Sequence, residues 1–287
     1  MTACDIPTVI PTVIPTVPLA DGGQIPLVGI GSLLAKGNEL ATILGHIIAD
    51  GYRLVDTAQQ YANETAVGEA VKRSGVARAE VFITSKVAGA EQGKRYTRRS
   101  IEDSLRRLDT DYLDALLIHW PNPSRGLYVE TWEEMLAAQA EGLVRHVGVS
   151  NFLPEHLTRL HEATGVWPVL NQIQLSVALP RTDLRAFHER HGIVTQAWRP
   201  LGGPEKLLDQ IVVGRLAAKH GVSAGQIVLR WCVQQGIVVI PSSSRRERWR
   251  ANADLFSFTL DESDMRDLAA LDTGDLHVWD ARTHEEW

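Results

Sequence analysis

Four side chains in the first half of the chain have the chemistry of a metal-free proton-transfer site. Asp56 ends the run "RLVD", Tyr61 lies five residues further on, Lys86 ends "VFITSK", and His119 lies near the end of "LDALLIHW". A free tyrosine has a pKa of about 10, and a nearby cation lowers it. We expect Asp56 to hold Lys86, and Lys86 to tune Tyr61 as a general acid. His119 is then placed to orient a polarised carbonyl oxygen.

Each of these residues also has a simpler structural explanation. An Asp at the end of a strand usually caps a helix or a turn, and a Lys is usually a solvated charge. Tyr61 and His119, taken singly, are consistent with core packing. The four residues nevertheless map to the same end of three consecutive expected strands. One shared site explains that coincidence better than four independent placements.

The elements that must position these residues alternate regularly along the chain. Short apolar runs indicate strands, and the amphipathic stretches between them indicate helices. The strands are expected at 27–31, 53–56, 81–86, 113–120, 144–151, 168–174, 193–198 and 237–243, and the helices at 39–50, 64–74, 97–108, 129–141, 154–164, 183–191, 207–220, 223–235 and 245–253.

Eight strand–helix units without a linker favour an α/β fold with parallel strands, namely a closed (β/α)8 TIM barrel. Extra helices are expected before the eighth strand and at the C-terminus. The segment 18–27 indicates an N-terminal β-hairpin that could plug the bottom of the barrel. An open Rossmann sheet is the alternative, but no G-x-G-x-x-G follows the first strand.

The overall composition limits which classes of binding partner and which cell compartment are expected. The chain has a net charge of −6 and a pI near 5.9, which gives no electrostatic case for nucleic acid or an anionic membrane. Two distant cysteines, Cys4 and Cys232, indicate a reducing compartment and no metal cluster. No apolar run is long enough for a membrane span, and no signal peptide is evident. We expect a cytoplasmic monomer.

The first residues differ in composition from the rest. The unit "IPTV" occurs three times in tandem between Ile6 and Val17. Proline at this density is typical of extended chain. We therefore expect a flexible proline-rich tail over 1–15, or an edge-strand addition by this segment, and a single domain over 16–287.

Seven sequence blocks, in order and at the right spacing, resemble the aldo-keto reductase family from about Thr16 to the C-terminus. These blocks are "GYRLVDTAQQYANE", "VFITSK", "DYLDALLIHWPNP", "EGLVRHVGVSNF", "LNQIQ", "AWRPLG" and "VVIPSSSRRERWRAN". The stretch "LYVETWEEMLAAQAEGLVRHVGVSNF" and the short tail look most like the bacterial 2,5-diketo-D-gluconate reductase branch. The resemblance implies a (β/α)8 barrel that transfers hydride from NADPH to an aldehyde or ketone, an oxidoreductase acting on CH–OH groups.

The resemblance also implies roles for individual residues. The catalytic set is Asp56, Tyr61, Lys86 and His119. Ser150, Asn151 and Gln172 would hold the nicotinamide carboxamide, and Trp198 would stack on the ring. The full set of implied cofactor residues is Gly31, Ser32, Asp56, Ser150, Asn151, Gln172, Trp198, Pro200, Leu201, Gly202, Ser242, Ser243, Ser244, Arg248 and Asn252.

The chain departs from the family pattern where the adenosine-ribose phosphate is expected to bind. Ser242 stands where the family usually has a lysine for the adenosine-ribose phosphate, although Arg248 remains and either Arg245 or Arg246 is available to compensate. We favour NADPH, with weakened discrimination against NADH as a hypothesis.

The expected pocket also differs, because Leu33 replaces a usual tryptophan and leaves a wider or more apolar mouth. The expected substrate-binding residues are Leu33, Tyr61, His119, Trp120, Asn122 and Trp287.

Two other functions remain open from the residues alone. A non-catalytic NADP(H)-binding sensor or auxiliary subunit would use the same fold, but it needs no tuned acid. A barrel aldolase would use Lys86 as a Schiff-base nucleophile. Pairing with Asp56 keeps that lysine protonated, which is the wrong state for a nucleophile.

Overall fold

The structure is a computed structural model that describes residues 13–274 and 278–286. Its main sheet has eight parallel strands in the order β10-β9-β8-β7-β6-β5-β4-β3. The strands are β3 (Ile30–Gly31), β4 (Leu54–Asp56), β5 (Phe82–Val87), β6 (Leu113–Ile118), β7 (Val144–Ser150), β8 (Leu170–Gln174), β9 (Val194–Trp198) and β10 (Val238–Val239).

The two edge strands meet and close the sheet into a barrel. Val28, just before β3, forms a parallel bridge with Val239 of β10. The amide of Gly29 donates to the Val239 carbonyl at 2.8 Å, and the Val239 amide donates to the Leu27 carbonyl at 2.9 Å. The expected (β/α)8 barrel is therefore confirmed.

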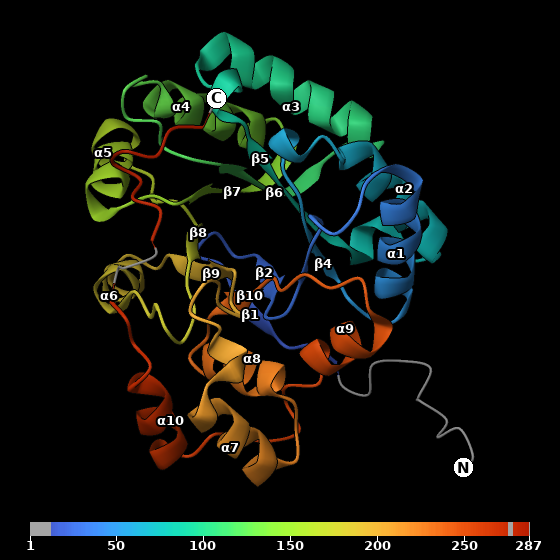
Figure 1. Ribbon diagram of the computed structural model, residues 1–287. Coiled ribbons are helices and arrows are strands. Elements are labelled where there is room, and N and C mark those ends of the chain that lie inside the picture. The colour runs from blue at the N-terminus through green and yellow to red at the C-terminus, as the bar shows by residue number, and fades with distance from the viewer. Residues whose placement is uncertain (1–12, 275–277, 287) are drawn as a thin grey trace.

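The helices surround the strands, as Figure 1 shows. They are α1 (Gly37–Ala49), α2 (Glu64–Ser74), α3 (Lys94–Leu108), α4 (Tyr128–Ala140), α5 (Pro154–Thr164), α6 (Thr182–Arg190), α7 (Ile211–His220), α8 (Ala224–Val233), α9 (Arg246–Ala253) and α10 (Glu262–Ala269). The pair α7 and α8 precedes β10, and α10 follows the last barrel helix, so the extra helices lie where the sequence predicts them.

Continuous apolar sequence explains why the strands are buried on both faces. All six residues of β6 are buried, and they include one charged residue, Asp114. Its carboxylate accepts hydrogen bonds from Arg78 (2.8 Å), from Arg145 (3.1 Å) and from the backbone amide of Ile83 (3.0 Å). These contacts compensate the buried charge near the amino end of the strand.

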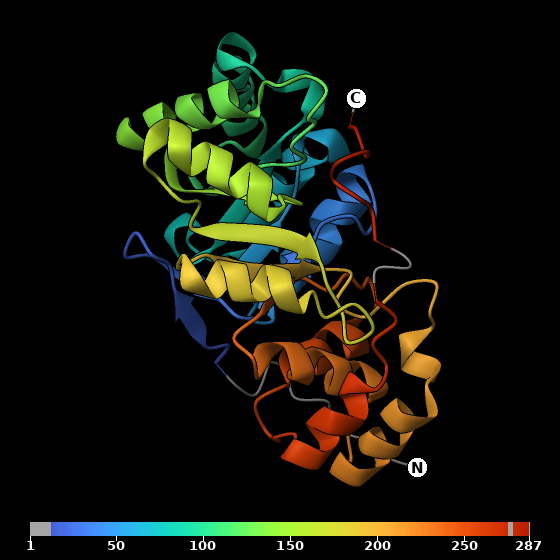
Figure 2. The ribbon, with the colours of Figure 1, turned by 90° about the vertical axis from the view of Figure 1, so that its left-hand side faces the viewer.

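The N-terminal hairpin covers the opposite end of the barrel from the strand termini that carry the predicted site. Strands β1 (Thr16–Pro18) and β2 (Gln24–Pro26) pair antiparallel. The carboxylate of Asp21 in the turn lies 2.8 Å from Nδ1 of His146 on β7. Figure 2 shows the hairpin (dark blue) and the C-terminal segment (red) on opposite sides of the barrel.

The predicted flexible tail over 1–15 lies mostly outside the described residues. Within the described part, the Pro15 carbonyl accepts a hydrogen bond from the Leu27 amide at 2.8 Å. Pairing with the barrel domain thus reaches at least one residue before the predicted boundary at Thr16. Across residues 13–274 and 278–286, no helix combines the length and apolar character that a bilayer crossing requires.

Candidate active site

A cavity of about 370 Å³ opens at the carboxyl ends of the barrel strands. Eighteen residues line it, namely Gly31, Ser32, Leu33, Asp56, Gln60, Tyr61, His119, Trp120, Ser150, Asn151, Gln172, Trp198, Arg199, Ile240, Ser242, Trp279, His284 and Glu286. Parallel strands direct their carboxyl ends to one mouth, which is where TIM-barrel enzymes build their active sites. The volume is within the range of small-ligand sites.

Asp56 and Tyr61 line this cavity, and Lys86, which does not line it, contacts both of them. Asp56 pairs with Thr84, two residues before Lys86, so the two charged side chains point to the same side of the barrel wall. Lys86 is fully buried, and its Nζ donates to Asp56 Oδ1 at 2.6 Å and to the Thr57 carbonyl at 2.8 Å. The same ammonium group hydrogen-bonds to the Tyr61 hydroxyl.

A short 3₁₀ helix, η1 (Gln59–Tyr61), places Tyr61 beside Lys86. Gln59 anchors it: its Oε1 accepts from the Ala88 amide at 3.0 Å, and its Nε2 donates to the Ser100 carbonyl at 3.1 Å. Ala62 ends the turn in the left-handed region at φ 51°. The position of Tyr61 is therefore fixed by contacts with β5 and α3 rather than by its own strand.

Burial dominates the proton affinity of Tyr61. It raises the pKa of the hydroxyl above its ordinary value of 10.0, and the Lys86 charge opposes this rise without cancelling it. The sequence predicts the effect of the cation, but the exclusion of water is larger and reverses the direction of the shift in the Tyr61 pKa. The hydroxyl is consequently protonated at neutral pH, as a proton donor must be.

The pKa of Lys86 is also raised. Burial alone would lower it, but the Asp56 carboxylate and the Tyr61 oxygen outweigh that penalty. Lys86 is therefore a permanent ammonium group at neutral pH, which agrees with the expected pairing and disfavours a nucleophilic lysine.

His119 follows β6 and completes the catalytic group that the sequence predicts. Its ring meets the Tyr61 ring edge-on, with centroids 5.7 Å apart. Nδ1 is buried and lies 2.6 Å from Oε1 of Glu286, outside the direction of a well-formed ring N–H hydrogen bond. The two atoms are therefore in close contact without forming a well-directed hydrogen bond, and both His119 and Glu286 line the cavity.

The residues expected to hold a nicotinamide carboxamide converge on the same cavity. Asn151 donates to the His119 carbonyl at 3.1 Å and accepts from Trp198 Nε1 at 2.8 Å. Gln172 donates to Asp56 Oδ2 at 2.6 Å, and the Ser150 hydroxyl donates to the Gln172 carbonyl at 2.9 Å. Buried amide and hydroxyl groups beside a half-buried tryptophan fit a flat, polar-edged ring such as nicotinamide.

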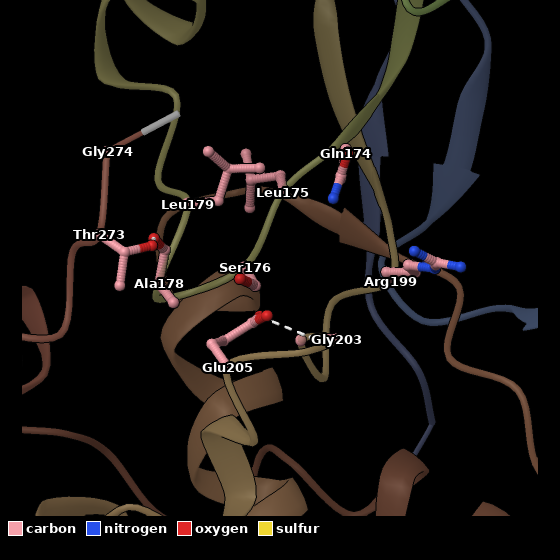
Figure 3. Close-up of a pocket in the computed structure, with 11 residues that line it drawn as sticks. Gln174, Leu175, Ser176, Ala178, Leu179, Arg199, Gly203, Glu205, Thr273 and Gly274 are labelled. Carbon is pink, nitrogen blue, oxygen red and sulfur yellow. Dashed lines mark hydrogen bonds between the residues drawn. The ribbon is translucent and has the colours of Figure 1, made fainter. Parts of the chain in front are cut away.

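The loop after β9 carries Pro200, Leu201 and Gly202, which lie outside the main cavity. Gly202 has a φ of 84°, and a Cβ there would lie 2.6 Å from Glu205 Oε1. Figure 3 shows Glu205 accepting the Gly203 amide, at 2.8 Å, next to a second cavity of only about 10 Å³. That small cavity has room for about one water molecule and contains none of the catalytic group.

The expected adenosine-binding residues form a separate strip along β10 and α9. The Ser242 hydroxyl donates to the Gly31 carbonyl at 3.1 Å, and Ser243 Oγ accepts from the Arg245 amide at 3.2 Å. Ser244 and Arg248 are exposed. Asn252 is buried and approaches Gly225 at the start of α8, where Leu201 also lies.

Arg246 is not placed to compensate for the missing lysine. Its guanidinium forms two hydrogen bonds to the Asp50 carboxylate, at 2.9 and 3.1 Å. Asp50 also accepts from Arg250 and Trp249. This leaves Arg245 and Arg248 as the arginines of this strip that the Asp50 cluster does not engage.

The substrate side differs from the expectation at one residue. Asn122 is fully buried and does not line the cavity, because both ends of its amide hold the backbone of Glu286. Trp287 lies outside the described residues. Leu33 is 68% exposed at the mouth, and Trp120 is buried in the wall.

Sequence reasoning missed six cavity residues: Gln60, Arg199, Ile240, Trp279, His284 and Glu286. The last three belong to the C-terminal segment 278–286. Trp279 packs against Trp120 and Trp198, with centroids 6.1 and 5.8 Å away. The stretch "HVWDARTHEEW" is dense in aromatic and charged residues, and that density is the sequence signal for a functional segment. It has no helical or strand periodicity from which the direction of each side chain could be predicted.

Comparison with known proteins agrees with this geometry. A model of the aldo/keto reductase family matches residues 35–273. The 2,5-diketo-D-gluconic acid reductase B of Corynebacterium sp. (strain SHS752001) is 43% identical, covering 94% of this chain and 98% of the relative. The methylglyoxal reductase DkgA of Salmonella typhimurium is 42% identical, covering 90% and 94%.

A solved structure extends the comparison. The crystal structure of a Gox0644 variant in complex with NADPH superposes with a TM-score of 0.91 at 39% identity, covering 96% of this chain and all of that one. Family model, relatives and fold all agree. The chain belongs to the aldo/keto reductase family and is an oxidoreductase.

Proposed function

We propose that this protein is an NADPH-dependent reductase of aldehydes or ketones, with Tyr61 as the general acid. The observation that carries the proposal is the contact chain from Asp56 through Lys86 to Tyr61, whose two end residues line a cavity of ligand size. The protonated Tyr61 hydroxyl can donate to an oxygen in the cavity, and the buried ammonium group of Lys86 stabilises the tyrosinate that remains.

NADPH is the proposed cofactor because the structurally similar Gox0644 variant was crystallised with it. When bound, the reduced nicotinamide would supply a hydride to the carbonyl carbon. Ser150, Asn151 and Gln172 would hold its carboxamide edge, and Trp198 would fix which face is presented. The proposal is supported by the hydrogen bonds that already connect Ser150 to Gln172 and Trp198 to Asn151, and all four residues line the cavity.

His119 would donate from the edge of its ring that faces the cavity. A donor there and the Tyr61 hydroxyl would bind the same carbonyl oxygen from two directions. The two rings meet edge-on with centroids 5.7 Å apart, and both residues line the cavity. Such a pair resembles an oxyanion hole, since it offers fixed donors where negative charge develops.

Cofactor selectivity rests on the strip along β10 and α9. The guanidinium of Arg246 is hydrogen-bonded to the Asp50 carboxylate, so Arg248 and Arg245 are the proposed partners of a 2′-phosphate. A guanidinium can bind phosphate through two parallel hydrogen bonds. With Ser242 in place of a lysine, we propose a preference for NADPH that is weaker than a lysine would give.

Two other functions fit less well. A pure NADP(H)-binding sensor has no use for a buried ammonium group connected to a tyrosine. An aldolase needs a neutral lysine, and the pKa of Lys86 is raised rather than lowered. Neither has an observation in its favour.

The test is turnover by the wild-type protein. NADPH and NADH oxidation is followed with aldehydes, ketones and the two substrates named by the relatives, methylglyoxal and 2,5-diketo-D-gluconate. The proposal expects one alcohol formed for each NADPH oxidised, with kcat/KM higher for NADPH. NADPH binding without alcohol formation from any of these carbonyls would favour the sensor and contradict the proposal.

A further inference from the structure

The C-terminal segment places a carboxylate behind the proposed catalytic histidine. Glu286 is 9% exposed and lines the cavity. Its Oε1 lies 2.6 Å from His119 Nδ1, and its Oε2 accepts the Gly89 amide at 2.8 Å. Both carboxylate oxygens are therefore in contact with other groups of the protein.

Two residues of the barrel loops, Asn122 and Gly89, fit closely around the backbone of Glu286. Asn122 Nδ2 donates to the Glu286 carbonyl at 2.8 Å, and the Glu286 amide donates to Asn122 Oδ1 at 3.0 Å. Asn122 adopts a φ of 43°, a left-handed conformation that few residues other than glycine and asparagine tolerate. A Cβ on Gly89 would lie 2.1 Å from the Glu286 carbonyl oxygen, so only glycine fits there.

The carboxylate is the nearest charged partner of the His119 ring among the described residues. The other cavity charges are arranged differently. Asp56 is paired with Lys86, and Arg199 is exposed over the rings of Trp198 and Trp279. Apart from Glu286, Nδ1 has no partner in residues 13–274 and 278–286. Without the carboxylate, a buried ring nitrogen would have nothing to fix its orientation.

We propose that Glu286 is a positioning residue, which holds His119 through Nδ1 so that the opposite edge of the ring faces the carbonyl oxygen. This inference rests on the proposed reductase function. A carboxylate at one ring nitrogen determines which proton the imidazole keeps and how the ring is turned. The C-terminal segment is thereby part of the active site and more than a cover over it.

The experiment compares Glu286→Ala and Glu286→Gln with wild type, using an aldehyde that the wild-type enzyme reduces. Glu285→Gln is the matched control, because it removes a carboxylate from the adjacent residue, which contacts the Ser124 amide outside the cavity. For each protein we measure kcat, kcat/KM and the NADPH Kd. Each assay is repeated with sodium formate, and with sodium chloride at the same ionic strength.

Glu286→Ala should lower kcat by about 10- to 100-fold, as expected when a reacting group is misplaced by about 1 Å, while the NADPH Kd changes little. Formate, a small carboxylate that fits the vacated space, should raise kcat of this variant where chloride does not. Glu286→Gln keeps the size but loses the charge, so its kcat should lie between those of Glu286→Ala and wild type. Glu285→Gln should match wild type.

Wild-type kcat in Glu286→Ala would overturn the inference. A lowered kcat that formate does not restore would also overturn it, because the loss would then come from detachment of the segment. If Glu286→Ala does not fold, wild-type kcat in Glu286→Gln, with or without formate, decides against the proposal. Absence of any wild-type reductase activity would instead contradict the proposed function itself.

Discussion

The two halves of the cavity are built in different ways. The half that carries Asp56 and Lys86 is part of the barrel wall, where each strand is bonded to a neighbour on either side. The half that carries Trp279 and Glu286 is a C-terminal segment without helix or strand. Moving the first half requires breaking the barrel. Moving the second requires breaking a few side-chain hydrogen bonds, such as those to Asn122, each worth about 1 kcal/mol.

This difference separates two tasks. A proton donor and its buried cation need fixed geometry, which rigid strands provide. Access and shape of a substrate site tolerate a less stable segment, and such segments open more easily than the core. The barrel half should therefore control the chemical step, and the C-terminal half should control substrate fit and the orientation of His119.

Lys86→Met is the strongest way to break the barrel half. It leaves Asp56 as an unpaired buried charge, which typically costs about 3–5 kcal/mol of stability. It also removes the cation beside Tyr61, so kcat should fall by about 10²- to 10⁴-fold. Urea unfolding and steady-state kinetics measure the two effects. Lys72→Met is the control, since its pair with Asp109 is exposed. Equal stability losses in the two variants would contradict the buried-pair account.

Acid sensitivity should come from a buried histidine outside the cavity, which lies between α6 and strands β8 and β9. His188 on α6 is fully buried, with its ring nitrogens 3.0 Å from Asn171 Nδ2 and 2.9 Å from Thr195 Oγ1. Burial lowers the pKa of His188 from 6.5 to about 3, so the unfolded chain takes up the proton first as pH falls. The stability from this residue is complete above pH 6.5 and is lost between that pH and about 3, at up to about 1.4 kcal/mol per pH unit.

Urea unfolding at about pH 7 and about pH 4.5 tests this origin of acid sensitivity. His188→Gln should lose less stability between the two pH values than wild type does. The exposed His46 provides the control, and His46→Gln should keep the wild-type pH dependence. An unchanged pH dependence in His188→Gln would place the acid sensitivity elsewhere.

Asn122→Ala tests how the C-terminal half is held. It removes both hydrogen bonds to the Glu286 backbone while leaving Asp56, Lys86 and Tyr61 untouched. We expect kcat/KM for a carbonyl substrate to fall by about tenfold, corresponding to roughly 1.4 kcal/mol, with NADPH binding nearly unchanged. If the NADPH Kd also rose by about tenfold, Asn122 would support the barrel half of the cavity as well.

Trp279→Ala should have the smallest effect. The ring is 47% exposed and packs on Trp120 and Trp198. Aromatic contacts contribute about 0.5–1.5 kcal/mol beyond area burial, so KM for an aromatic aldehyde should rise by about two- to tenfold. KM for methylglyoxal, which has no ring, should change less. Equal changes for both substrates would contradict a role in substrate shape.

The same contrast explains what the sequence could predict. Buried parallel strands leave continuous apolar runs, and residues at the ends of those runs must share one mouth. Asp56, Lys86 and His119 follow from that rule. The helix α2 begins and ends where its amphipathic pattern predicts, at Glu64 and Ser74.

Other features depend on contacts that have no periodic signature. Glu286 meets His119 across 167 positions of sequence, and no local pattern encodes such a contact. Asn122 is predicted as a pocket residue, but its side-chain amide instead holds the backbone of Glu286 in the C-terminal segment. The rise in the pKa of Tyr61 depends on water exclusion by the whole cavity, which composition cannot supply.

The central claim is that Tyr61 donates the proton, and a single-turnover measurement of Tyr61→Phe tests it most directly. The variant lacks one oxygen and keeps the ring against His119. Enzyme loaded with NADPH is mixed with excess aldehyde, and NADPH absorbance is followed in wild type and variant, with the NADPH Kd measured beside it. We predict a loss of about 10²- to 10⁴-fold in the single-turnover rate with the Kd nearly unchanged. A wild-type rate in Tyr61→Phe would contradict the claim.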